Sequence, residues 1–172
     1  SGSDNEHGNG IVSDAAGNTY LTGWFKGGTM SFGTYNLTAS GTNEEIFVAK
    51  YNSFGFAQWA VSVGSSSFEL GNGICLDNTA NPVISASYQS AITVGTTPIP
   101  SYGGQDVLIA KFSSANGANI WAIGGGGSAS DYAYKIGADA AGNVYTAGNF
   151  NGTGNFGTNS ITSIGIADIF VA

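Results

Sequence analysis

The sequence predicts an all-β protein assembled from repeated four-stranded antiparallel sheets. Three observations predict this fold class. The composition is that of strands and tight turns, one pattern recurs three times along the chain, and one strand of each repeat is apolar on both faces. These features favour sheets that stack face to face about an axis, the arrangement of a β-propeller.

The composition suits one folded domain and excludes several classes of partner. Of the 172 residues, 42% are hydrophobic and only 9% are charged, and 28 glycines are interleaved with Thr, Val, Ile and aromatic residues. The net charge is −7, with four lysines and no arginine. We therefore expect no nucleic-acid partner, because a surface that binds phosphates needs positive charge. No apolar run is long enough to cross a bilayer, so we expect no membrane span.

A repeat of about 62 residues organises the chain. Its opening pattern is GNGIVSDAAGNTYLTGWF from Gly8, GNGICLDNTANPVISASY from Gly71 and AYKIGADAAGNVYTAGNF from Ala133. A second pattern is EIFVAKY from Glu45, DVLIAKF from Asp106 and DIFVA from Asp168. The expected units are residues 1–62, 63–125 and 126–172, of which the third lacks its last strand.

Each unit reads as four strands in order. In the first unit these are GIVSD, TYLTGWF, IFVAKY and QWAVSV, with a Gly- and Thr-rich excursion after the second strand that suits a short extra hairpin. Gly17 and Gly142 stand where a tight turn requires positive φ. The middle unit has Ala80 there and Pro82 shortly after, so we expect its turn to differ.

The third strand of each unit carries the argument for the architecture. IFVAKY and VLIAKF are nearly continuous apolar runs instead of alternating ones. Such a strand is covered on both faces. An antiparallel sheet of this kind needs a further sheet on each side, which radial stacking of blades supplies.

The order of these motifs resembles the SBBP repeat, a family named for seven-bladed β-propeller-like modules. The resemblance covers essentially the whole chain and departs from the pattern at Ala80, Pro82 and Ala86. It implies a propeller fold and an extracellular or cell-surface location on bacteria. It implies no particular activity.

About three blades are present, whereas a propeller typically has about four to eight. We therefore expect a partial propeller, or a segment of a larger one, with apolar blade faces exposed at both ends. The expected partners of those faces are the remaining blades of a larger chain or, as second choice, a second protomer.

Nine of the eleven acidic residues fall at three repeat positions: Glu6, Glu69 and Asp131; Asp14, Asp77 and Asp139; Glu45, Asp106 and Asp168. A catalytic pair needs two unlike environments, whereas equivalent repeat positions give similar ones. We therefore expect the turn aspartates and the acids before the third strand to accept backbone N–H bonds, and we predict no catalytic residue.

The set Glu6, Glu69 and Asp131 admits two interpretations. These acids precede the first strand, and if that strand lines a channel they would form an arc of carboxylates that could hold calcium. No D-x-D-x-D-G loop supports this reading, and a solvated or hydrogen-bonded loop is the other. No other cofactor is expected.

Two single residues and one glycine run have structural interpretations. His7 aligns with Leu70 and Tyr134, which favours packing of its ring over metal ligation, and Cys75 reads as a small buried hydrophobe. The run GGGGS at residues 124–128 reads as a linker between units.

Aromatic residues divide by periodicity. Trp59 and Trp121 recur at one repeat position, so we expect them to pack the fourth strand. Trp24 does not recur, and with Tyr35 and Tyr102 it could form a surface on which sugars stack.

These observations predict a noncatalytic, secreted or cell-surface propeller segment that acts in scaffolding, adhesion or assembly. The alternative is a propeller that binds carbohydrate or another ligand, such as a surface glycan or a cell-surface protein. A propeller enzyme, a lyase or a glycosidase, is the third alternative, and it would need acid and base groups that do not follow the repeat.

Overall fold

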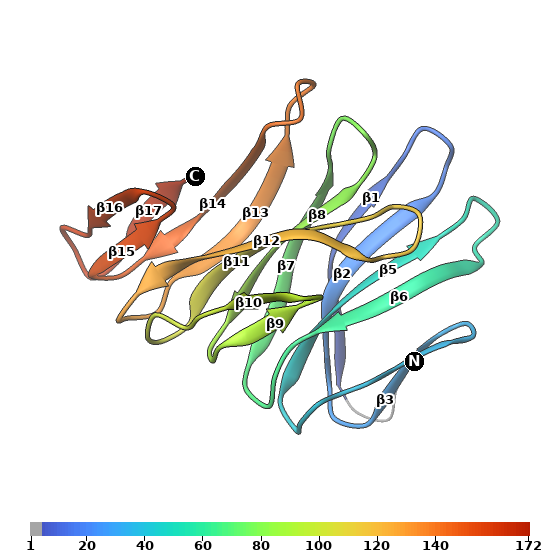
Figure 1. Cartoon of the computed structure of the whole chain (residues 1–172), viewed down its shortest axis with the longest axis horizontal. Coiled ribbons are helices and arrows are strands. Elements are labelled where there is room, and N and C mark those ends of the chain that lie inside the picture. Colours follow the sequence, from blue (N-terminus) through green and yellow to red (C-terminus); the bar gives the residue numbers. More distant parts are fainter. Residues whose placement is uncertain (1–4) are drawn as a thin grey trace.

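The computed structural model describes residues 5–172, which form seventeen β-strands with no helix among them. Three sheets lie side by side along the molecule, one for each repeat unit (Figure 1). The fold is therefore all-β and built from four-stranded antiparallel blades, as the sequence predicts.

The first unit is a four-stranded sheet in which each strand pairs with its neighbour in an antiparallel register. Its strands, from one edge to the other, are β1 (Glu6–Ser13), β2 (Thr19–Lys26), β5 (Glu44–Tyr51) and β6 (Ala57–Val63).

The second unit repeats this order, and the third has three of the four strands. The second contains β7 (Glu69–Leu76), β8 (Pro82–Tyr88), β11 (Asp106–Phe112) and β12 (Asn119–Gly127). The third contains β13 (Tyr132–Ala138), β14 (Val144–Phe150) and β17 (Asp168–Val171).

The excursion after the second strand of each unit is a hairpin. The three hairpins are β3 (Thr29–Phe32) with β4 (Tyr35–Thr38), β9 (Ile92–Val94) with β10 (Thr97–Ile99), and β15 (Thr153–Phe156) with β16 (Asn159–Thr162). Only β15 joins a main sheet, because the backbone of Gly126 and Gly127 in β12 pairs with Asn155 and Gly154.

That pairing corrects one expectation. The run at residues 124–128 is not a linker, because Gly124–Gly127 form the end of β12, which passes the boundary expected at residue 125. Without side chains, these glycines let the neighbouring hairpin approach the strand closely. A Cβ on Gly127, for example, would clash with the Thr153 carbonyl oxygen.

The units stack through their first strands. β7 contacts β1, β2 and β5 of the unit before it, and β13 contacts β7, β8 and β11. We call the face of a unit that meets the preceding unit its leading face and the opposite one its trailing face. The junction between two units is a seam.

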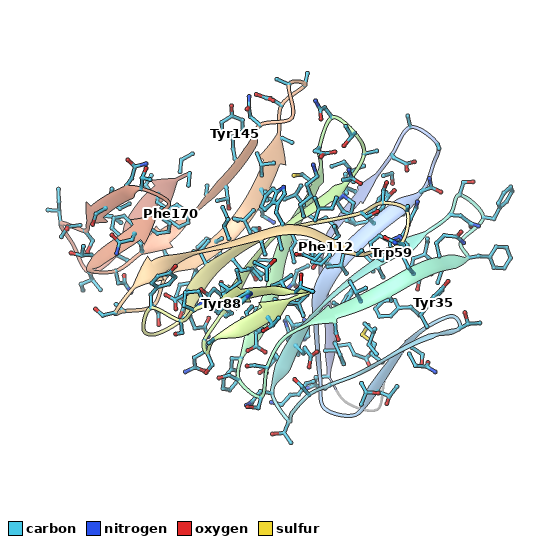
Figure 2. All side chains as sticks on the ribbon, in the orientation of Figure 1. Tyr35, Trp59, Tyr88, Phe112, Tyr145 and Phe170 are labelled. Carbon is cyan, nitrogen blue, oxygen red and sulfur yellow. The ribbon has the colours of Figure 1, made fainter. Side chains whose placement is uncertain are left out.

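The core follows these seams. Between the first two units, Tyr20, Ile46 and Trp59 of one sheet pack with Leu108 and Phe112 of the next. Figure 2 shows the side chains of Trp59 and Phe112 close together in this seam. A second cluster fills the next seam, and a third holds β3 and β4 against the leading face of the first unit. The third strands β5 and β11 are buried on both faces, as predicted.

The turn of the middle unit does not differ from the other two, so the expectation from Ala80 and Pro82 is wrong. Ala80 adopts positive φ, at 59°, and the N–H of Ala80 donates to the Asp77 carbonyl oxygen as the N–H of Gly17 does to that of Asp14. The turn therefore keeps the geometry of the other two, and Ala80 bears the strain of a left-handed conformation.

Candidate functional site

The acids of the first turns act as backbone caps. Oδ1 of Asp14 accepts the N–H groups of Ala16 and Asn18, each at 2.9 Å, and Asp139 caps Ala141 and Asn143 with the same distances. The hydrogen bond from the Asn18 side chain, with the backbone donors, lowers the pKa of Asp14. These carboxylates are therefore stabilised in the charged form.

The turn acid of the middle unit has a cation as well. Asp77 caps Thr79 and Asn81 and forms an ion pair with Lys111 of β11. Burial opposes the charged form, but the contact with Lys111 and the backbone donors outweigh it and lower the pKa of Asp77 to about 2.

The acids before the third strand cap the loop that leads into it. Glu45 accepts the backbone N–H of Ser40 at 2.7 Å, Asp106 that of Tyr102 at 2.7 Å, and Asp168 that of Ile164 at 2.6 Å. This is the framework role that the sequence predicts.

Glu69 and Asp131, at the beginning of the first strands of their units, lie across the seams from the acids that cap these loops. A Cβ on Gly126 would collide with Asp106 Oδ1 and lie 2.9 Å from Asp131 Oδ2, so both carboxylates converge on this glycine. Glu45 and Glu69 converge on Gly64 in the same way at the first seam. Each seam thus contains two carboxylates, one from each unit.

The pair at the second seam is sealed from solvent. Asp106 and Asp131 are both fully buried, and Oδ1 of Asp106 accepts no hydrogen bond from the described residues. Burial raises the pKa of Asp106, and the charge of Asp131 raises it further. Burial raises the pKa values of Asp131 and Glu69 as well.

Sequence reasoning missed these pairs because each joins two different repeat positions. The signal was present as an acid followed by a second acid after 24 positions (Glu45 and Glu69) or 25 positions (Asp106 and Asp131), with a glycine five positions before the second acid. That spacing recurs at both seams.

The expected arc of Glu6, Glu69 and Asp131 does not come together as a metal centre. Glu69 and Asp131 belong to separate seams, where each meets a carboxylate of the preceding unit. Among residues 5–172 no three His, Cys, Asp or Glu side chains are grouped so that they could hold a metal ion.

The three nonperiodic aromatic residues lie on separate elements. Trp24 is on β2, Tyr35 is on β4 and Tyr102 is in the loop before β11. Tyr35 and Tyr102 are exposed, whereas Trp24 stacks on His7, with ring centroids 4.4 Å apart and planes at 19°. The His7 ring therefore packs on an aromatic partner.

Trp59 and Cys75 take the structural places that the sequence predicts. Trp59 is buried in the first seam, where its Nε1 donates to the Ser114 carbonyl oxygen at 3.2 Å. Cys75 is a buried free thiol, and burial raises its pKa to about 11.

The trailing face of the third unit exposes apolar side chains that no described element covers. Ile169 and Val171 of β17 and Tyr145 of β14 project from it into solvent, and Figure 2 shows Tyr145 at the periphery of the sheet. A groove of about 500 Å³ on this face is lined by Tyr134, Lys135, Ala147, Asn149, Ile169 and Val171. The described residues include no helix that is long and apolar enough to span a membrane.

Comparison with known proteins supports the architecture. The chain is 28% identical, over 157 residues, to an uncharacterized WD repeat-containing protein of Acanthamoeba polyphaga mimivirus. The match covers 82% of this chain but only 11% of the viral protein. No family model matches the sequence. The chain is thus similar to a repeat protein whose name denotes propeller blades, and its sheets are of that kind.

Proposed function

We propose that this chain is a noncatalytic β-propeller segment whose role is scaffolding or assembly, at the bacterial cell surface or outside the cell. The location follows from the resemblance of its motifs to SBBP repeats. The role is supported by what the acidic side chains do.

The single observation that carries the proposal is the use of the periodic acids. Within residues 5–172, all of them except Glu6 accept at least one backbone N–H bond, at the turns, in the loops or across the seams. These bonds hold the carboxylates in place as parts of the turns, loops and seams, which supports a framework role over a catalytic one.

The two carboxylate pairs do not suit a glycosidase. An acid and a nucleophile must both reach the sugar. Asp106, Asp131 and Glu69 are fully buried and Glu45 nearly so, at 5% exposure. The pairs are therefore closed to a polysaccharide chain.

The test is a turnover assay on one variant of a seam acid and one variant of a turn acid. The protein, Asp131→Asn and Asp14→Asn are incubated with a panel of neutral and acidic polysaccharides, and new reducing ends and unsaturated products are measured. We expect no turnover in any of them, together with shifted melting temperatures in the variants. Turnover that is lost in Asp131→Asn but kept in Asp14→Asn would overturn the proposal. Surface biotinylation of the native cells tests the location.

A carbohydrate-binding role is the second candidate, supported by the exposed rings of Tyr35 and Tyr102. The stack with His7 covers one face of the Trp24 indole, which leaves less of this ring for a sugar. Glycan-array binding that Trp24→Ala abolishes would favour this role over the first.

A further inference from the structure

The trailing face of the third unit presents apolar side chains that the same fold buries elsewhere. Ile169 is 85% exposed and Val171 is 73% exposed. Their equivalents in the first unit, Ile46 and Val48, are fully buried, and those in the second, Val107 and Ile109, are 3% and 7% exposed. In both cases the cover is the leading face of the next unit.

The leading face of the first unit is the matching half of such a seam. Ile11 is 73% exposed, whereas the equivalent Ile74 and Ile136 pack against the preceding unit. Gly117 of the second unit fits against the ring of Trp59, but the equivalent Gly55 has no atom near the position of a Cβ. Phe56 beside it is exposed as well. One chain therefore carries both halves of an interface that it forms twice internally.

We propose that the trailing face of the third unit binds the leading face of the first unit of a second copy of this chain. The contact is head to tail and repeats the internal seams, so Ile169 and Val171 pack against the surface that includes Ile11 and hairpin β3–β4. Such a contact joins two different faces and can extend into a closed ring or a chain of copies. The inference rests on the assembly role proposed above and names the partner.

The first strand of the third unit makes this seam looser than the internal ones. All three first strands have a bulge at the same place, at Asn9, Asn72 and Tyr134. The first two asparagines donate across the seam, Asn9 Nδ2 to the Gly71 oxygen at 2.9 Å and Asn72 Nδ2 to the Ala133 oxygen at 2.8 Å. Tyr134 instead donates to Asn149 within its own unit.

The residue after the bulge also makes the seam of the third unit looser. Gly10 and Gly73 leave room for an isoleucine of the next unit, since a Cβ on them would lie 3.1 Å from Ile74 Cγ2 and 3.4 Å from Ile136 Cγ2. The third unit has Lys135 at this position. A side chain there props the two faces apart, so the association between copies is reversible and depends on concentration.

The test uses the whole 172-residue chain and two variants, one on each face. Sedimentation velocity from low micromolar to submillimolar concentration is expected to show dimers and larger species in the parent protein. Val171→Asp and Ile11→Asp each remove one half of the contact and are expected to sediment as monomers. Their mixture is expected to form dimers and nothing larger, because each variant retains the half that the other lacks.

Two further variants give the test its controls. Lys135→Gly restores the residue of the internal seams and is expected to lower the dissociation constant by about tenfold. Ile120→Asp changes an exposed residue on β12 of the middle unit, which forms neither face of the proposed contact, and is expected to change nothing.

A parent protein that stays monomeric throughout, or variants that fail to complement each other, would overturn the inference. Either result leaves the turnover assay unaffected, so failure of this contact and failure of the noncatalytic role are distinguishable. Circular dichroism melts confirm that each variant is folded, which is expected because all four residues lie on the surface.

Discussion

The carboxylates of the turns and those of the seams recur with the same period but have opposite electrostatics. Asp14, Asp77 and Asp139 receive several donors each, and their pKa values are lowered. Asp106 and Asp131 lie together in a buried seam, and their pKa values are raised. Periodicity thus identifies an acid as framework, whereas its surroundings decide whether it favours the charged or the neutral form.

The difference gives the two sets opposite effects on stability. An acid whose pKa is lowered in the folded state stabilises the protein at pH values above its unfolded pKa. This stabilisation is lost as the pH falls through its folded pKa. An acid whose pKa is raised in the folded state stabilises the protein at pH values below its unfolded pKa. This stabilisation is lost as the pH rises through its folded pKa. The two sets together therefore favour a stability maximum on the acid side of neutrality.

Removing the cation of the middle turn has the largest expected effect. Lys111→Met leaves the buried Asp77 carboxylate without its ion pair and makes this turn acid resemble a seam acid. We expect a loss of about 2–3 kcal/mol in the free energy of unfolding at pH 7, measured with urea. Lys50→Met is the matched control, because Lys50 donates to the Ser114 carbonyl oxygen and not to a carboxylate. An equal loss in both variants would contradict the role of charge.

Neutralising one seam acid should raise stability. Asp106→Asn keeps the cap on Tyr102, and its amide can donate toward Asp131, which removes the repulsion between the two carboxylates. The gain is expected to be about 1 kcal/mol at pH 8. It should shrink toward pH 4, where the acids of the parent protein bind protons. Thermal melts over that range measure the gain, and a gain that does not depend on pH would contradict charge repulsion between the two carboxylates.

Removing a turn acid should have the opposite sign. Asp14→Ala loses the caps on Ala16 and Asn18, and we expect a loss of about 1 kcal/mol at pH 7. The loss diminishes below the unfolded pKa, since the carboxyl is then protonated in the unfolded chain and progressively in the folded one. If Asp14→Ala and Asp106→Asn followed the same pH dependence, the distinction between turns and seams would not hold.

The smallest effect concerns the backbone of the turns. Ala80→Gly removes the steric cost of the positive φ of 59°. The greater freedom of glycine in the unfolded chain offsets part of this gain, so we expect a net stabilisation of about 0.5 kcal/mol. Gly17→Ala, at φ 80°, is the reverse experiment and should destabilise it. Unchanged melting temperatures in both variants would contradict the assignment of strain.

The sequence predicts local features of this fold well. The order of strands, the caps of Asp14 and Asp139 and the two buried faces of β5 and β11 each follow from residues that are close in the chain or from one repeat position. The turn at Ala80 was predicted wrongly because propensity at one residue was given more weight than the capping pattern that surrounds it. The role of Gly124–Gly127 was missed because a glycine run suits a linker and also suits a strand against which another strand pairs closely.

The seams could not be predicted in the same way. A pair such as Glu45 and Glu69 forms only when two units stack, and alignment of the repeats places these residues in different columns. The arrangement of Trp24, Tyr35 and Tyr102 likewise depends on where hairpins lie in space. Tyr35, for example, is placed by the packing of β3–β4 on the leading face of the first unit, which no local pattern specifies.

The pairing of β15 with β12 has a mechanical consequence. Because of it, the second and third units share a sheet of six strands, whereas the first two units meet mainly through side chains. Under tension along the stack, backbone hydrogen bonds from Gly126 and Gly127 would hold the second junction in addition to its side-chain packing. The first junction would depend on its packed side chains alone, so the two junctions should respond differently to load.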